Sequence, residues 1–148
     1  FNIDVIRSDD LCAAAAQRWK GLGITGRNDQ FVVCYIGSLT ERITKHAFLQ
    51  DAVTAFVRLA ERYPDLRLVI CGGGEELDHW SRIAAPHPNV IVSGRVDHAD
   101  LVVLMERSRA GLVPYPNTPD FARSLPNKVA EYVSADLPVI SKGLSTTA

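Results

Sequence analysis

Short apolar runs without polar alternation recur along the chain and end near glycine, proline or serine. They occupy residues 31–37, 66–74, 89–94, 110–115 and 137–141. Runs of this kind are typical of strands that are buried on both faces of a parallel sheet. The pattern therefore predicts five buried strands.

Helical periodicity fills the intervals between these runs. In 46–63, apolar residues recur at spacings of three and four, at Phe48, Ala52, Ala55, Phe56 and Leu59. Further helices are predicted at 9–20, 75–84, 98–108 and 125–135. The repeated β–α alternation predicts an α/β fold, a doubly wound parallel sheet with right-handed crossovers. Because ligands of such sheets bind beyond the carboxyl ends of the strands, the residues after each strand are the candidates for function.

Composition narrows the class of protein. With 148 residues, 47% of them hydrophobic, the chain should form one domain over 1–148 with a substantial core. A formal net charge of -1 argues against a nucleic-acid groove or a polybasic membrane patch. No apolar run approaches the roughly 18 residues of a transmembrane helix. Cys12, Cys34 and Cys71 are widely spaced, which favours reduced thiols in a cytoplasmic protein.

A glycine and a lysine follow the first predicted strand. Gly37 allows a close backbone turn, and Lys45 lies near the start of the next helix. Free amides at a helix start, together with a lysine, attract anions. The alternative is a loop glycine and a solvated lysine.

The turns after the second and third strands offer weaker signals. Gly72, Gly73 and Gly74 permit close approach of a ligand to the backbone, but their spacing matches neither a dinucleotide fingerprint nor a Walker lysine loop. Arg95 and Val96 form a short loop that could present backbone groups to a base. Arg95 itself is either a phosphate ligand or a surface arginine.

The segment 121–141, FARSLPNKVAEYVSADLPVIS, combines a helix start with three polar side chains. Ser124 is a natural N-cap. Asn127, Lys128 and Glu131 share one helical stripe because they are three and four residues apart. A phosphate suits the helix amides and Lys128, and the carboxylate one turn deeper can accept two hydrogen bonds from sugar hydroxyls.

The other side of this helix should face the sheet. Val129, Val133 and Tyr132 are the residues predicted to do so. The alternative to a binding stripe is an ordinary surface pair of Lys128 and Glu131, worth about 0.3 kcal/mol.

Four blocks, taken together and in order, resemble a known family. They are RWKGLGI, VVCYIGSLTERITKHAFLQDAVTAFVRLAERYPDLRLVICGGGEE, NVIVSGRVDHADLVVLMERSRAGLVPY and SLPNKVAEYVSADLPVIS. From about residue 17 to 143 the chain is similar to the carboxyl-terminal, donor-binding half of glycosyltransferases with two Rossmann-like domains, the GT-B fold. The likeness is greatest to the GT4 group, glycosyl transferases group 1.

This resemblance implies binding of a nucleotide-diphosphate sugar, UDP-, GDP- or ADP-linked. It implies transfer of a hexose-like sugar with retention, in cooperation with an N-terminal acceptor domain. We expect no cofactor and no metal ion, because no acidic cluster with ligand spacing is present and the histidines show none either.

The resemblance also implies roles for individual residues. Glu131 would bind the donor ribose, and Arg95 with Val96 would contact the base. Lys45 and Lys128 would stabilise the charge of the leaving diphosphate. The complete predicted donor-binding set is Gly37, Ser38, Lys45, Gly73, Arg95, Val96, Ser124, Asn127, Lys128 and Glu131.

The chain departs from the family pattern at two positions. Many members carry two glutamates with seven residues between them. In this chain Glu131 stands at the second of these positions, but Arg123 stands at the first. Many also carry an arginine where this chain has Ser38, and Lys128 is a candidate replacement. Two alternatives therefore stay open: a non-catalytic nucleotide-binding or interaction module, and a nucleotide-sugar epimerase of the same GT-B architecture.

The first and last residues suggest part of a longer protein that includes the acceptor domain. We expect residues 1–148 alone to bind nucleotide weakly, to catalyse no transfer and to form weak homo-oligomers through an exposed sheet edge. The full-length enzyme would be cytoplasmic and could lie peripherally at the inner membrane face. We expect no nucleic-acid partner and no transmembrane segment.

Overall fold

The computed structural model of the chain describes residues 9–46, 49–115, 119 and 127–141, and within 44–46 the backbone alone. Its elements are α1 (Asp9–Gly21), β1 (Phe31–Ile36), α2 (Glu41–His46), α3 (Leu49–Arg62), β2 (Leu66–Cys71), α4 (Leu77–Ala84), β3 (Val90–Gly94), α5 (His98–Arg107), β4 (Ala110–Val113), α7 (Asn127–Ser134) and β5 (Val139–Ser141). The predicted strands and most of the predicted helices are thus confirmed, with boundaries shifted by a few residues.

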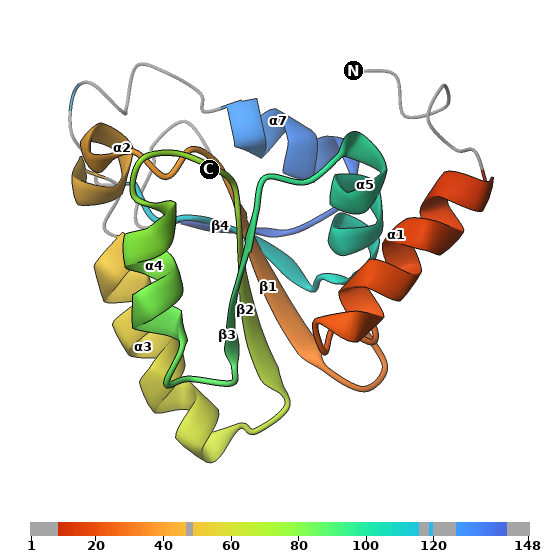
Figure 1. Cartoon of the computed structure of the whole chain (residues 1–148), viewed down its shortest axis with the longest axis horizontal. Coiled ribbons are helices and arrows are strands. Elements are labelled where there is room, and N and C mark those ends of the chain that lie inside the picture. Colours follow the sequence, from red (N-terminus) through yellow and green to blue (C-terminus); the bar gives the residue numbers. More distant parts are fainter. Residues whose placement is uncertain (1–8, 47–48, 116–118, 120–126, 142–148) are drawn as a thin grey trace.

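Within the described residues the strands form one sheet of five, all parallel, in the order β3-β2-β1-β4-β5 (Figure 1). Strands β2 and β3 are added in succession on one side of β1, and strands β4 and β5 are added in succession on its other side. The connectivity therefore switches between β1 and β4, which pair through Val33 with Ala110 and Cys34 with Gly111. Crevices at such a switch are where open α/β sheets bind ligands.

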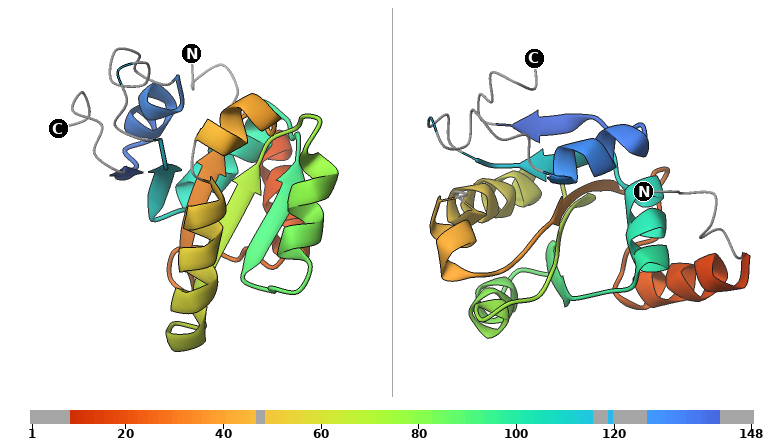
Figure 2. Two further views of the ribbon diagram at one scale, coloured as in Figure 1. Left: turned by 90° about the vertical axis from the view of Figure 1, so that its left-hand side faces the viewer. Right: turned by 90° about the horizontal axis from the view of Figure 1, so that it is seen from above.

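Helices cover both faces of the sheet, α3 and α4 on one and α1, α5 and α7 on the other (Figure 2). Alternate residues of β1 supply the two cores. Val33 and Tyr35 point to the α3–α4 side, and Val32 and Cys34 to the opposite side. This alternation explains the continuous apolar runs, because both faces of each inner strand are buried.

The predicted helix at 46–63 differs from the structure. The structure describes two helices here, α2 up to His46 and α3 from Leu49. Residues 47 and 48, and therefore Phe48, lie outside the described residues. Leu49 and Val53 are buried against the sheet, whereas Leu59 is 46% exposed. The apolar face is therefore rotated from the predicted one, because α3 packs through Leu49 and Val53.

The outer side of α3 borders an apolar cavity of about 330 Å³ beside the ends of β4 and β5. Phe56 and Leu59 line it from the helix, Leu112 and Ile140 from the strands, and Pro114 from the position just after β4. Phe56 also packs against the core on this face of the sheet, whereas Leu59 borders the cavity and is largely exposed. The predicted homo-oligomer stays a prediction.

Helix α7 packs by a face different from the predicted one. Val129 and Tyr132 are buried as expected, but Val133 is 65% exposed. At about 100° per residue, Tyr132 lies between Lys128 and Val129 around the helix, and Val133 lies beyond this arc. The prediction for Val133 is wrong because Lys128, which is 7% exposed, completes the buried face instead.

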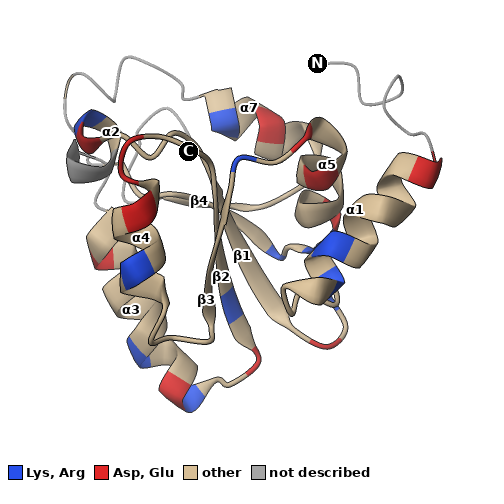
Figure 3. Cartoon of the chain, in the orientation of Figure 1, with Lys and Arg blue, Asp and Glu red and all other residues tan. Residues whose placement is uncertain are grey.

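No helix in the described part of the chain is long and apolar enough to cross a membrane. In the view of Figure 3, basic and acidic residues both occur along the described helices. All three cysteines are free thiols, as predicted, and Cys34 and Cys71 are buried in the core.

Candidate functional site

A cavity of about 230 Å³ lies at the carboxyl ends of β1, β2 and β3. It is lined by Ile36, Gly37, Ser38, Cys71, Gly72, Gly73, Arg95, Val96 and Leu101. Five residues of the predicted donor-binding set, from three separate loops, therefore line one cavity: Gly37, Ser38, Gly73, Arg95 and Val96.

The glycine turns are held together by backbone hydrogen bonds beyond the strands. The Gly37 N–H donates to the Cys71 carbonyl at 3.0 Å, and the Gly72 N–H donates to the Gly94 carbonyl at 3.1 Å. A Cβ atom at Gly72 would overlap the Gly37 carbonyl oxygen. Glycine is required at position 72 by this close approach, which keeps the floor of the cavity compact.

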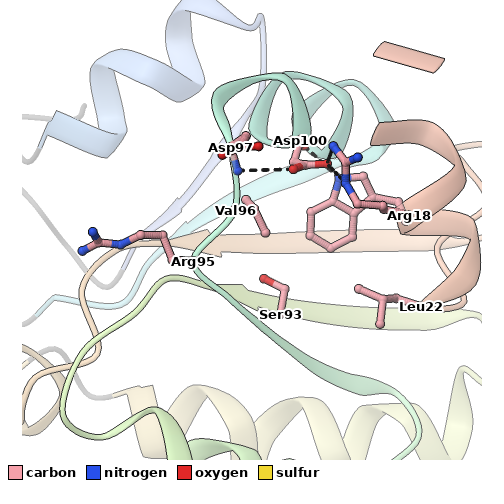
Figure 4. A pocket seen from close by; sticks show the side chains of 8 residues that line it. Arg18, Leu22, Ser93, Arg95, Val96, Asp97 and Asp100 are labelled. Atoms are coloured by element: carbon pink, nitrogen blue, oxygen red, sulfur yellow. Dashed lines mark hydrogen bonds and ion pairs between the residues drawn. The ribbon is translucent and has the colours of Figure 1, made fainter. Parts of the chain in front are cut away.

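Arg95 is exposed at the rim of this cavity. Its side chain packs beside Gly73, where an added Cβ would lie 3.4 Å from the Arg95 Cβ. In Figure 4 its guanidinium points away from the pair formed by Arg18 and Asp100. Arg95 makes no hydrogen bond or ion pair with any described residue, so its donors are available to a ligand.

A second cavity, of about 370 Å³, shares Arg95 and Val96 with the first as lining residues (Figure 4). Arg18 and Asp100 line it and form an ion pair at 2.6 Å. The Asp100 carboxylate also accepts a hydrogen bond from the Asp97 N–H at 3.2 Å. Asp100 therefore fastens α1 to the start of α5, and its charge is already paired.

Sequence reasoning missed this ion pair. Asp97 followed three residues later by Asp100 is a capping-box spacing, which signals the helix start but not the partner. Nothing local in the sequence connects Asp100 with Arg18, which is 82 positions away.

Lys128, in the first turn of α7, reaches back over the sheet edge toward β1. Its Nζ lies 4.0 Å from the centroid of the Tyr35 ring and 4.7 Å from that of the Tyr115 ring. It forms no hydrogen bond in the described structure. A Cβ at Gly37 would lie only 2.6 Å from this nitrogen, so the ammonium sits directly against the glycine turn that lines the first cavity.

Burial determines the protonation of this lysine. Desolvation of the ammonium lowers the pKa of Lys128 from its ordinary value of 10.5 to about 7, and the negative charge of Glu131 only partly offsets this effect. No ion pair joins Lys128 to Glu131, which is half-buried. The alternative of an ordinary surface pair is therefore wrong, because the lysine is buried against two tyrosines.

Tyr132 fixes α7 over the gap between β1 and β4. Its hydroxyl donates to the Cys34 carbonyl at 3.1 Å and accepts from the Ile36 N–H at 3.0 Å. Its ring lies where a Cβ at Gly111 would be, so glycine is required there too. The sequence indicated a residue facing the sheet, but not this hydrogen-bonded anchor.

The remaining predicted residues are placed less fully. Asn127 is exposed as the first residue of α7. Lys45 belongs to α2, but its side chain, like the whole of Ser124, lies outside the described residues. Among the residues that the structure describes, no group of three or more His, Cys, Asp or Glu side chains could hold a metal ion.

The chain thus has a doubly wound α/β fold, with a glycine-lined cavity beyond the carboxyl ends of β1, β2 and β3. Sheets of this kind bind ligands at that edge. The family glycosyl transferases group 1 matches residues 30–147. The chain belongs to this family. No curated protein sequence matches it.

Solved glycosyltransferases share the fold. WaaG, a glycosyltransferase involved in lipopolysaccharide biosynthesis, is similar over 88% of this chain and 33% of its own, with a TM-score of 0.64 and 17% identity. The pneumococcal O-GlcNAc transferase GtfA, solved in complex with UDP and GlcNAc, is similar over 78% of this chain and 21% of its own. The TM-score is 0.57 and the sequence identity is 18%. AviGT4, a glycosyltransferase involved in avilamycin A biosynthesis, is similar over 80% of this chain and 34% of its own. The TM-score is 0.54 and the sequence identity is 20%.

These likenesses concern the fold, and they confirm the predicted Rossmann-like domain of GT-B type. The chain spans about a third or less of each of these structures.

Proposed function

We propose that this domain binds a nucleotide-diphosphate sugar and serves as the donor half of a glycosyltransferase. The observation that carries the proposal is Lys128, a buried lysine that has no hydrogen-bond partner among the described residues. It lies against Gly37, which lines the glycine-rich cavity. A cation in this position, beside the start of a helix, suits a phosphate better than any neutral group.

In the proposed complex the donor lies along the cavity, from the end of β3 toward α7. Its base lies near Arg95 and Val96, and its diphosphate lies against Gly37, where Lys128 and the free amides of α7 supply positive charge. Glu131, one turn into α7, accepts hydrogen bonds from the ribose hydroxyls. Ser38, Lys45, Gly73, Ser124 and Asn127 complete the proposed site.

The chemistry is transfer of a hexose through an oxocarbenium-like state. Negative charge grows on the departing diphosphate, and Lys128, with Lys45, stabilises it without a metal ion or a cofactor. We propose a retaining reaction of GT4 type on a UDP-, GDP- or ADP-linked donor. The acceptor, and any catalytic base, would come from an N-terminal domain, and the enzyme would act in the cytoplasm.

Calorimetry of the chain against ADP, GDP, UDP and their nucleosides tests the first step. We expect one nucleoside diphosphate to bind, and its nucleoside to bind at least tenfold more weakly because it lacks the charged phosphates. Added salt should narrow this difference. Equal affinity for nucleotide and nucleoside would remove the proposed phosphate site.

A further inference from the structure

Tyr35 and Tyr115 form an aromatic cage around the Lys128 ammonium. Tyr35 lies on β1 and Tyr115 follows β4, so the cage spans the switch point of the sheet. Tyr35 is fully buried and Tyr115 is 7% exposed. Both rings lie within the distance at which a lysine ammonium is attracted to the face of an aromatic ring.

The cage holds the cation without neutralising it. Burial raises the pKa of Tyr35 and that of Tyr115, so both phenols are uncharged at neutral pH. The charged group that acts on Lys128 is Glu131, three residues along α7, and it forms no ion pair with the lysine. Among the described residues this buried ammonium has neither a hydrogen bond nor a counter-ion, which is costly and points to a ligand as its partner.

We propose that Tyr35 and Tyr115 are positioning residues, which hold Lys128 beneath the Gly37 turn with no counter-ion among the described residues. The donor diphosphate then becomes the counter-ion and is bound together with a proton. The inference rests on the proposed function. It adds two residues to the site, and it makes donor binding depend on pH.

The direction of the pH dependence follows from the charge of Lys128. In the free domain its pKa is about 7, so a fraction of the molecules carries an uncharged amine at neutral pH. A bound phosphate favours the ammonium and raises that pKa. Affinity is therefore complete below pH 7 and falls as pH rises toward the pKa of the bound state, and binding at neutral pH takes up a proton.

Proton uptake is measured by calorimetry in two buffers of different ionisation enthalpy. The probe is the glucose ester of whichever of ADP, GDP and UDP binds most tightly, because an esterified terminal phosphate does not titrate near neutrality. We expect uptake of a fraction of a proton per ligand at neutral pH and an affinity that declines as the pH rises above 7. Lys128→Met should abolish both effects and weaken binding about ten- to hundredfold at pH 7.

The positioning role of the two tyrosines is tested by how binding affinity depends on pH in their variants. Tyr35→Leu and Tyr115→Leu should each weaken binding about two- to thirtyfold and move the midpoint of the pH profile to lower pH. Tyr35→Phe and Tyr115→Phe, which keep the ring face, should retain the wild-type midpoint. Lys20→Met and Tyr63→Leu, at exposed positions away from the cavity, are the matched controls.

The outcomes separate the inference from the proposed function. If no nucleotide binds at any pH, the proposed function fails and the inference falls with it. Binding without proton uptake, or with a pH profile that Lys128→Met leaves unchanged, overturns the inference alone. Leucine variants that lose affinity equally at every pH would show that the tyrosines have only a structural role.

Discussion

The ring of Tyr132 fills the space above Gly111 that any side chain on that strand residue would occupy. The tyrosine belongs to α7 and the glycine to β4, and the same phenol is hydrogen-bonded to the backbone of β1. The contacts of Tyr132 thus fix the distance of α7 from the sheet at the switch point. They thereby also fix the position of Lys128 over the Tyr35 ring.

Gly111→Ala should destabilise the domain by roughly 1–3 kcal/mol, because the methyl group overlaps the Tyr132 ring in a packed core. Urea unfolding followed by circular dichroism measures this change. Gly21→Ala is the control, since a Cβ there meets no atom within 4 Å and should change stability little. Equal stability of the two variants would mean that α7 can shift to accommodate the methyl group.

Tyr132→Phe should cost about 1–3 kcal/mol of stability without changing the shape of the core. It leaves the Ile36 N–H and the Cys34 carbonyl without their side-chain partner. The same unfolding measurement applies, with Tyr63→Phe as the matched control, because Tyr63 is 52% exposed. A loss no larger than that of the control would contradict the anchoring role.

Lys128→Met should stabilise the unliganded domain at pH 7 by roughly 2–5 kcal/mol, since an unneutralised buried lysine is removed. In the unfolded chain Lys128 titrates near 10.5, and in the folded domain near 7. Between these values the unfolded state binds more protons, so the stability of the wild-type domain rises with pH relative to that of the variant. The advantage of the variant should therefore shrink from pH 7 to pH 10, and a constant difference would contradict burial of the lysine.

Glu131→Gln should weaken nucleotide binding by about 1.5–3 kcal/mol under the proposed function, because a charged acceptor for the ribose hydroxyls is lost. The nucleoside without phosphates should lose affinity to a similar extent, which distinguishes this change from Lys128→Met. Calorimetry with both ligands measures the effect, and Glu61→Gln on the exposed side of α3 serves as the control. Unchanged affinity would remove Glu131 from the site.

The sequence predicted most of the elements because their signals are local. Apolar runs such as 31–37 and 66–74 indicate buried strands wherever the strands lie in the sheet. The glycine turns were also predictable, since their place after consecutive parallel strands brings Gly37, Gly73 and Arg95 to one edge. The roles of these residues toward a donor remain predictions.

The arrangement around Lys128 was decided only by the tertiary structure. Spacing alone placed this lysine on a polar stripe with Glu131, because helical periodicity gives relative angles but not the direction that faces the core. Tyr35 and Tyr115 are 80 positions apart in the chain, and only the pairing of β1 with β4 brings them to the same lysine. The sequence by itself thus determined the elements and the loops at the sheet edge, whereas long-range packing decided which cation lies beneath Gly37 and how strongly it is desolvated.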